Sequence, residues 1–193
     1  MKLIKQIKHS CNQRKLKSIA EKIHPAADQA AIDGISFLEF MNQLLHAELD
    51  ARSQRELERK IKDAKLPMKH DLAAYDCALI KGMPPVKLAQ LRELTWIDQL
   101  YNLIIIGPSG VGTTMLSAGL CHAAILGGYK AYFRTMDQIM SMLKAKDTLK
   151  SAQVEYRRLS KADLIVIDDI MMMDPEKRQA NAFFHFINAM HER

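Results

Sequence analysis

The 193-residue sequence has few of the residues that build disulfide or metal frameworks, and each scarcity excludes a class of protein. Its three cysteines lie far apart with no C-x-x-C pair, and none of its seven histidines belongs to an H-E-x-x-H motif. A disulfide scaffold or a zinc site of the usual spacing is therefore not expected. No apolar run reaches the roughly 18 residues of a membrane-spanning helix, and lysines interrupt the N-terminus where a signal peptide needs an apolar stretch. We expect a cytoplasmic protein that does not enter a membrane.

Positive charge is plentiful, and it is concentrated at the N-terminus. The net charge of the chain is +6, and residues 1–24 hold seven basic side chains against one acidic side chain, which accounts for the whole excess. A basic segment suits a polyanion such as double-stranded DNA. A lysine-rich helix face that only contacts solvent is the alternative. The candidate DNA-binding residues are Lys5, Lys8, Arg14, Lys15 and Lys17.

The sequence divides into a helical N-terminal region, a linker and an α/β core. Residues 1–66 carry apolar residues at helical spacing, and Ser36 and Glu39 form an S-x-x-E capping box before one of the helices. Residues 67–101 contain three prolines and one glycine, which predicts a linker with a short helix. In residues 102–193 strands alternate with helices, a pattern typical of a parallel sheet.

Three strands are predicted in this core. Residues 103–106 are apolar throughout, as expected of a strand buried on both faces. Residues 130–134 predict a second strand, and Thr135 and Gln138 then form a capping box for the next helix. Residues 164–167 predict the third strand. The fold class is therefore α/β with a parallel sheet, preceded by an all-helical region.

A glycine-rich loop follows the first predicted strand. Residues 107–114 fit G-x-x-x-x-G-K-[ST], except that Thr113 stands at the lysine position. The glycines permit turns that point successive N–H groups at a phosphate, and the positive end of the following helix faces the same place. Thr114 supplies a hydroxyl for Mg²⁺. A glycine turn without a ligand is the alternative. The predicted ATP-binding residues are Gly107, Pro108, Ser109, Gly110, Val111, Gly112, Thr113, Thr114 and Met115.

Two carboxylates follow the third predicted strand, and they match a Walker B motif. Asp168 is the predicted Mg²⁺-linked acid, together with Thr114, and Asp169 is the predicted catalytic acid that orients or activates the attacking water. Paired acids also occur as simple strand caps, but the order and spacing of the two motifs favour a nucleotide site. The neutral Thr113 forfeits a charge-assisted contact worth about 1.5–3 kcal/mol. We therefore expect weakened ATP binding and impaired hydrolysis.

Short segments spread over most of the chain match a known family. They are Tyr75-Asp76, residues 91–94 (LREL), Trp96-Ile97, residues 102–107 (NLIIIG) and 113–116 (TTML), and in the N-terminal region residues 37–40 (FLEF) and Leu44-Leu45. In these the chain resembles the IstB family of transposition helpers, close relatives of the DnaC helicase loaders. The resemblance implies a P-loop AAA+ ATPase that binds ATP and Mg²⁺. It also implies assembly on DNA as an ATP-dependent homo-oligomer and recruitment or stimulation of a transposase.

Two departures from the family pattern leave hydrolysis open. One is Thr113, and the other is the ending at Arg193, because the family continues with a strand bearing a polar sensor residue and then an arginine finger. That strand belongs between the P-loop strand and the Walker B strand, so we expect a C-terminally incomplete sheet with a gap in its middle. The chain is then a fragment, a truncated gene copy or a shortened form of a longer protein.

The leading hypothesis is an ATP-binding helper of DNA transposition. A DnaC-like helicase loader in DNA replication and a degenerate, non-catalytic DNA-binding remnant are the alternatives within this family. A small P-loop kinase has a similar loop, but such kinases carry it at the start of the chain.

Overall fold

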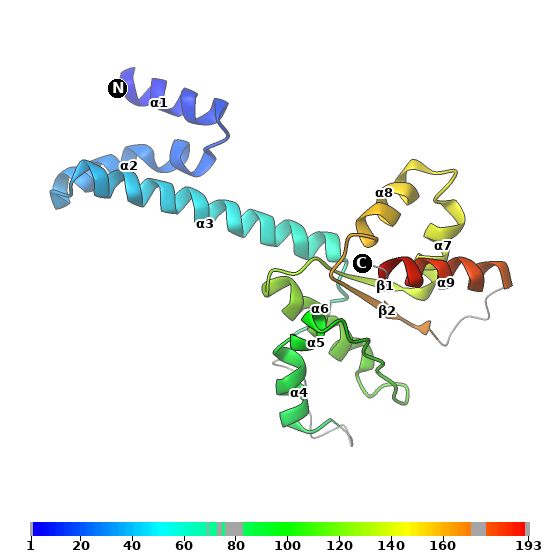
Figure 1. Ribbon diagram of the computed structural model, residues 1–193. Helices are drawn as coiled ribbons and strands as arrows, with labels where there is room; N and C mark the ends of the chain where they lie inside the picture. Colours follow the sequence, from blue (N-terminus) through cyan, green and yellow to red (C-terminus); the bar gives the residue numbers. More distant parts are fainter. Residues whose placement is uncertain (1, 69, 73–74, 76–82, 171–176, 192–193) are drawn as a thin grey trace. The chain divides into compact units, whose positions relative to one another are not determined.

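The computed structural model describes residues 2–68, 70–72, 75, 83–170 and 177–191, and it divides into two compact units. Unit 1 (Met1–Arg59) contains only helices, drawn from blue to cyan in Figure 1. Its elements are α1 (Lys2–Gln13), α2 (Lys17–Asp33) and most of α3 (Phe37–Ala64). None of the helices in the described ranges is long and apolar enough to cross a membrane.

Unit 2 (Lys60–Arg193) is an α/β unit around a small parallel sheet. It begins with the last turn of α3 and continues with α4 (Pro85–Arg92), α5 (Thr95–Asp98), α6 (Thr113–Leu126), β1 (Ala131–Thr135), α7 (Met136–Ala145), α8 (Lys150–Leu159), β2 (Leu164–Asp168) and α9 (Lys177–His191). Strands β1 and β2 pair in parallel, with Ala131 opposite Leu164 and Thr135 opposite Asp168.

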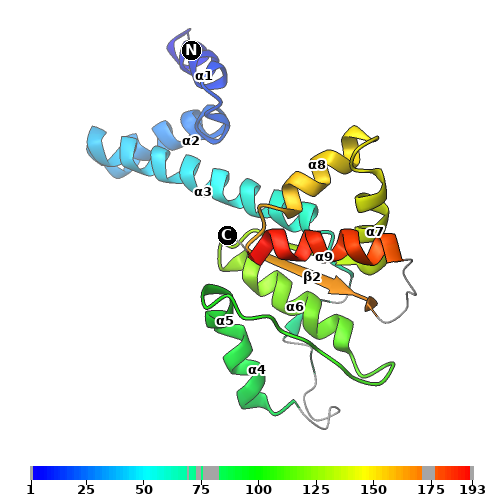
Figure 2. The same ribbon diagram turned by 45° about the vertical axis from the view of Figure 1, so that its right-hand side comes forward.

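Helices cover both faces of this sheet. On one face Tyr132, Ile165 and Ile167 pack against a core built by α7, α8 and α9, in which Ile139, Leu159 and Phe186 are almost completely buried. Helix α6 contacts both strands. Figure 2 shows α9 lying along β2. Alternation of side chains along a strand explains this layering, because successive residues point to opposite faces.

The predicted capping box at Thr135 is confirmed, and of the one predicted at Ser36 the structure shows the bond to the serine hydroxyl. The Thr135 hydroxyl accepts a hydrogen bond from the Gln138 N–H at 3.3 Å, and the Gln138 side chain accepts from the Thr135 N–H at 3.2 Å, so the predicted capping box begins α7. At the start of α3 the Ser36 hydroxyl accepts from the Glu39 N–H at 3.2 Å. These hydroxyls satisfy backbone donors that the first turn of a helix leaves without intrahelical partners.

The prediction of a buried strand at residues 103–106 is wrong. These residues pair with neither strand of the sheet and are not assigned to a strand. Ile104 and Ile106 are 80% and 81% exposed. Between this segment and β2 lies a cavity of about 230 Å³. A strand needs a neighbour for its backbone N–H and C=O groups, and an apolar sequence alone does not supply one.

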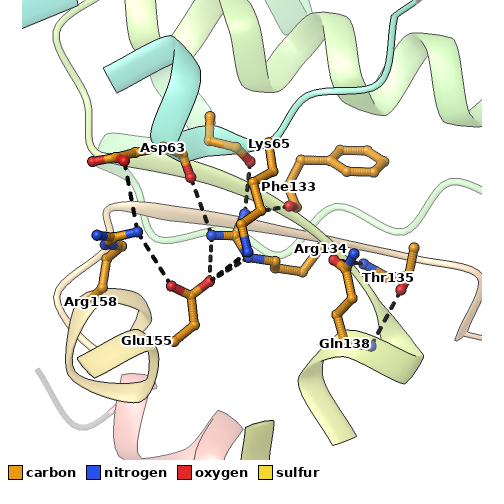
Figure 3. A network of polar contacts seen from close by, with 9 residues as sticks. Asp63, Lys65, Phe133, Arg134, Thr135, Gln138, Glu155 and Arg158 are labelled. Carbon is orange, nitrogen blue, oxygen red and sulfur yellow. Dashed lines mark hydrogen bonds and ion pairs between the residues drawn. The ribbon is translucent and has the colours of Figure 1, made fainter. Parts of the chain in front are cut away.

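Among the described residues of unit 2, Arg134 on β1 is the buried charged side chain, at only 2% exposed. Its guanidinium donates to the Glu155 carboxylate on α8 through Nε at 2.7 Å, and to the carbonyls of Ala64 at 2.8 Å and Asp63 at 3.2 Å. Figure 3 shows the guanidinium between the end of α3 and α8. The last carbonyls of a helix have no intrahelical donor, so Arg134 both neutralises Glu155 and caps α3.

Glu48 is the corresponding buried charge of unit 1, at 3% exposed. Its Oε2 accepts from the backbone N–H of Ser18 at 2.7 Å and of Ile19 at 3.3 Å, at the start of α2. Its Oε1 accepts from Arg52 at 3.0 Å. Burial alone would raise the pKa of Glu48, but the hydrogen bonds from Arg52, Ile19 and Ser18 outweigh it and lower the pKa. A carboxylate at a helix start is also favoured by the helix dipole.

Arg134→Met should lower the free energy of unfolding of unit 2 by about 3 kcal/mol or more, because Glu155 loses its buried partner and two helix-end carbonyls lose their donor. The fluorescence of Trp96, the single tryptophan of the chain, reports unfolding of this unit in urea. Arg158→Met is the matched control. Arg158 also contacts Glu155 and Asp63, at 3.4 and 3.8 Å, but its side chain is 33% exposed, so its removal should cost under about 1 kcal/mol. Equal destabilisation by the two variants would contradict this account of Arg134.

Glu48→Gln should weaken the start of α2 by about 1.5–3 kcal/mol at neutral pH, the usual worth of hydrogen bonds to a charged group. A carboxyl group whose pKa is lowered by folding stabilises the fold above its ordinary value of 4.5, and that stabilisation is lost as the pH falls through the lowered pKa. The difference between the two proteins should therefore shrink in acid. Hydrogen-exchange protection of the Ser18 and Ile19 amides, corrected for intrinsic rates, measures it. A difference that grows in acid would refute the assignment.

Candidate nucleotide site

The glycine-rich loop has the backbone conformation that a phosphate-binding turn requires. Gly110 and Gly112 adopt left-handed φ angles of 86° and 89°, and Gly112 is the residue at which α6 begins. Residues with a side chain rarely adopt these angles. The Val111 N–H donates to the Pro108 carbonyl at 3.4 Å and closes the turn. The N-terminus of a 14-residue helix, with its unpaired N–H groups and positive dipole end, thus opens onto the loop.

The two limbs of the loop lie too close for a side chain at Gly107. A Cβ atom there would stand 2.9 Å from Val111 Cγ2 and 3.2 Å from Thr113 Cγ2. The methyl groups of Val111 and Thr113 therefore take the space that a side chain at Gly107 would need. The donors that a phosphate would meet in such a loop are backbone N–H groups, above all those at the start of the helix that follows.

The two nucleotide motifs meet at one cavity. Thr113, at the start of α6, and Asp168, at the end of β2, both line the cavity of about 230 Å³ beside residues 101–105. Its walls are otherwise mostly apolar, from Ile104, Ile105 and the residues of β2. Polar side chains also come from Tyr101 and Asn102 before the loop and from Ser117 on α6. The cavity itself is the space between β2 and the unpaired segment.

The other predicted site residues lie around this point, mostly at the surface. Thr114 is exposed in the first turn of α6, and its carbonyl accepts from Ser117 Oγ at 3.1 Å. Asp169 is exposed and has a left-handed φ of 58°, which marks the end of β2. Pro108 and Ser109 are exposed, and Met115 is half-buried. The structure therefore brings Thr113 and Asp168 to one cavity, while Thr114 and Asp169 do not line it.

A segment before the core packs against the loop and α6, and sequence reasoning missed it. A Cβ at Gly112 would contact Tyr75 Cε2 at 3.4 Å, and one at Gly119 would stand 2.4 Å from the Leu72 side chain. Leu72 and Tyr75 thus lie against two glycines seven residues apart. In the sequence Tyr75 stands out only through the family resemblance, and Asp76, its partner in that motif, lies outside the described residues. No spacing rule connects Tyr75 to a loop so far along the chain.

Two titratable side chains on α6 have shifted pKa values, and burial is the main cause of both shifts. Burial raises the pKa of the Cys121 thiol to about 12, so this cysteine is not a thiolate nucleophile. Burial, and secondly the neighbouring His70, lower the pKa of His122; the two rings lie edge to face with centroids 4.8 Å apart. Within the described ranges, His, Cys, Asp and Glu form no group of three that could hold a metal ion.

The predicted DNA-binding residues all lie in unit 1, on α1, the turn after it and the start of α2. Four are exposed and Lys8 is half-buried. Unit 2 carries a second set of exposed basic residues. The net charge of the chain does not reveal them, because acidic residues elsewhere balance their charge. They lie on and beside α7 and α8: Lys144, Lys150, Arg157 and Lys161.

Known proteins are similar in sequence to this chain along almost its whole length. A family model described as IstB-like ATP binding protein matches residues 9–193. An IS21-like insertion-sequence ATP-binding protein of Bacteroides fragilis is 33% identical over 98% of this chain and 72% of its own length. A second such protein, from B. fragilis strain YCH46, is 32% identical over 96% of this chain and 94% of its own. The insertion sequence IS5376 ATP-binding protein of Geobacillus stearothermophilus is 27% identical over 97% of this chain and 74% of its own.

Proposed function

Because this chain belongs to the family of IstB-like ATP binding proteins, we propose that it binds ATP with Mg²⁺ as a helper of DNA transposition, with double-stranded DNA and a transposase as its partners. The P-loop AAA+ fold of the family accounts for unit 2, an α/β domain whose parallel sheet has two strands in the described residues. Hydrolysis of ATP is impaired in this proposal.

The geometry of residues 107–114 carries the nucleotide part of the proposal. Two left-handed glycines and the start of α6 together form a cradle for phosphate oxygens in this proposal. Backbone N–H groups and a helix N-terminus favour such anions without any charged side chain. The Thr114 hydroxyl and the Asp168 carboxylate are the oxygen ligands that would hold Mg²⁺, which prefers such ligands and keeps several waters.

Thr113 leaves this loop without the positive charge that a lysine would supply. A lysine at the position would place a positive charge on the β- and γ-phosphates, and a threonine offers only a hydroxyl. The missing charge weakens binding by about 1.5–3 kcal/mol, and it matters more in a transition state in which charge is redistributed. Asp169 then orients the attacking water at a site where the transferring phosphoryl group is poorly stabilised.

Thr113→Lys should tighten binding of Mg²⁺-ATP by about 1.5–3 kcal/mol, or roughly 10- to 150-fold, because it restores a charged donor to a loop that is already formed. Calorimetric titration measures the affinity. Thr113→Gln is the matched control, since it adds length and hydrogen-bonding groups without charge and should gain little. Asp168→Ala should abolish the dependence on Mg²⁺. No gain from lysine, or an equal gain from glutamine, would show that the loop does not bind phosphate as proposed.

The DNA part of the proposal rests on the basic residues of unit 1. Replacing Lys5, Lys8, Arg14, Lys15 and Lys17 by glutamine should weaken binding to a random duplex. It should also make the slope of log affinity against log salt concentration less steep, by about 0.9 for each phosphate that is no longer neutralised. Fluorescence anisotropy at several salt concentrations gives both quantities. Glutamine at Lys144, Lys150, Arg157 and Lys161 removes a similar charge from unit 2 and is the control. Weaker binding in the control variant alone would place the DNA-binding surface in unit 2.

A further inference from the structure

Three side chains from the segment before the core lie along α6. Each meets one position of that helix or of the loop before it: His70 meets His122, Leu72 meets Gly119 and Tyr75 meets Gly112. On a helix with 100° per residue, positions 112, 119 and 122 fall within an arc of roughly 80°. The three contacts therefore share one face of α6, and they run from its third turn to its start as the chain advances. We call His70, Leu72 and Tyr75 the strap residues.

The middle one of these contacts depends on a glycine. A Cβ atom at Gly119 would stand 2.4 Å from two atoms of the Leu72 side chain and 3.1 Å from the His70 carbonyl oxygen. Leu72 and Gly119 are both buried. Glycine is a poor helix former, so this packing gives a reason for its position inside α6. Any side chain there would push the strap residues away from the helix.

Tyr75 is held in place by its own surroundings before it meets the loop. Its N–H donates to the Leu72 carbonyl at 3.3 Å, which closes a turn. Its half-buried side chain packs against a cluster of buried leucines from three places in the chain: Leu72, Leu88, Leu116 and Leu120. A Cβ atom at Gly112 would lie 3.4 Å from Tyr75 Cε2, an ordinary van der Waals distance. The edge of a fixed ring thus lies beside the residue at which α6 begins.

The loop has few interactions of its own that would hold its conformation. Gly110 and Gly112 take left-handed φ angles, and glycine has more conformational freedom to lose than any other residue. Gly112 also begins α6 with no side chain that could cap the helix. The hydrogen bond from the Val111 N–H to the Pro108 carbonyl is long, at 3.4 Å. Contacts from outside the loop therefore contribute much of its order.

We propose that Tyr75 is a positioning residue of the glycine-rich loop. Its ring limits the movement of Gly112, and so holds the N–H groups at the start of α6 in the arrangement that receives a phosphate. The ligand in this inference rests on the proposed function, whereas the packing of Tyr75 on the loop does not. The role is larger here than in a loop with a lysine, because the neutral Thr113 leaves recognition to preorganised backbone donors.

Backbone NMR relaxation of the full chain without nucleotide tests the positioning role directly. Tyr75→Ala should lower the ¹⁵N order parameters of Gly110 and Gly112 to about 0.6 or below, the range of a flexible backbone. Tyr75→Phe keeps the ring edge and should preserve the wild-type values. Gly119→Ala should loosen the loop as well, although alanine favours a helix, because its Cβ displaces Leu72.

Leu91→Ala is the matched control for this measurement. Leu91 is half-buried on α4 and packs against the same leucine cluster as Tyr75. Its truncation should lower the stability of unit 2 without changing the order parameters of the two glycines. An equal loss of order in this variant would mean that the general packing of the cluster holds the loop, and it would overturn the role of Tyr75.

Binding of two ligands separates a role at the phosphates from a role at the base. Tyr75→Ala should weaken binding of Mg²⁺-ATP and of Mg²⁺-tripolyphosphate by the same factor, roughly tenfold, because one or two backbone residues must then be ordered on binding. Calorimetric titration measures both affinities. A loss confined to ATP would mean that Tyr75 contacts the base, and it would overturn the positioning role.

The remaining outcomes also decide the matter. Unchanged order parameters in Tyr75→Ala, or an equal loss of order in Tyr75→Phe, refute the assignment to the ring. If Tyr75→Ala does not fold, Gly119→Ala takes its place, and an unchanged loop in that variant refutes the role of the strap residues. A wild-type chain that binds neither ligand contradicts the proposed function, and the order parameters then still decide whether Tyr75 positions the loop.

Discussion

Arg134 imposes the strictest constraint in unit 2, because a buried guanidinium is tolerated only when its donors are matched by acceptors. The acceptors come from three places in the sequence: the end of α3, β1 itself and Glu155 on α8. Satisfying them fixes β1 against these helices. The register of β1 with β2 then places Asp168 beside Thr135 at the end of the sheet. At this position Asp168 lines the same cavity as Thr113 at the start of α6. The position of the candidate magnesium ligand thus depends on a charge that takes no part in the chemistry.

The same physical rule organises unit 1 with the opposite sign. Glu48 is buried, and the acceptors of its carboxylate are matched by two backbone donors at the start of α2 and by Arg52. A helix start without a side-chain cap of its own is thereby satisfied from a distance, since Leu16 at the cap position of α2 has no hydroxyl or carboxylate. In both units a charged side chain from a distant part of the sequence satisfies the backbone groups at a helix end, in place of a neighbouring capping residue. Removing either charged side chain leaves its partners buried without their hydrogen bonds, which destabilises the unit.

Features with a local cause could be predicted from the sequence, and features with a distant cause could not. The capping box at Thr135 is confirmed, because a hydroxyl cap acts between near neighbours, and the strands at residues 130–134 and 164–167 are confirmed to within a residue. Residues 103–106 show the reverse. Four apolar residues predict burial, but whether a strand forms depends on a partner elsewhere in the chain, and that information is absent from the segment. The burial of Arg134 and the contact of Tyr75 with Gly112 could not be predicted for the same reason, because spacing shows which residues share a face and not what covers that face.

The candidate site separates two properties that a P-loop usually combines. Shape comes from the glycines and the helix start, and the left-handed φ angles of Gly110 and Gly112 are present here without a lysine, since they depend on residues that lack side chains. Charge comes from the side chain at position 113, which is neutral. In the proposed function a loop with shape alone still recognises phosphate, because N–H groups and the helix dipole act on any anion. What it lacks is the part of the interaction that grows as charge moves in a transition state. Binding and turnover therefore need not fail together in this protein, and a chain that occupies its site slowly or weakly can still serve as a nucleotide-dependent helper.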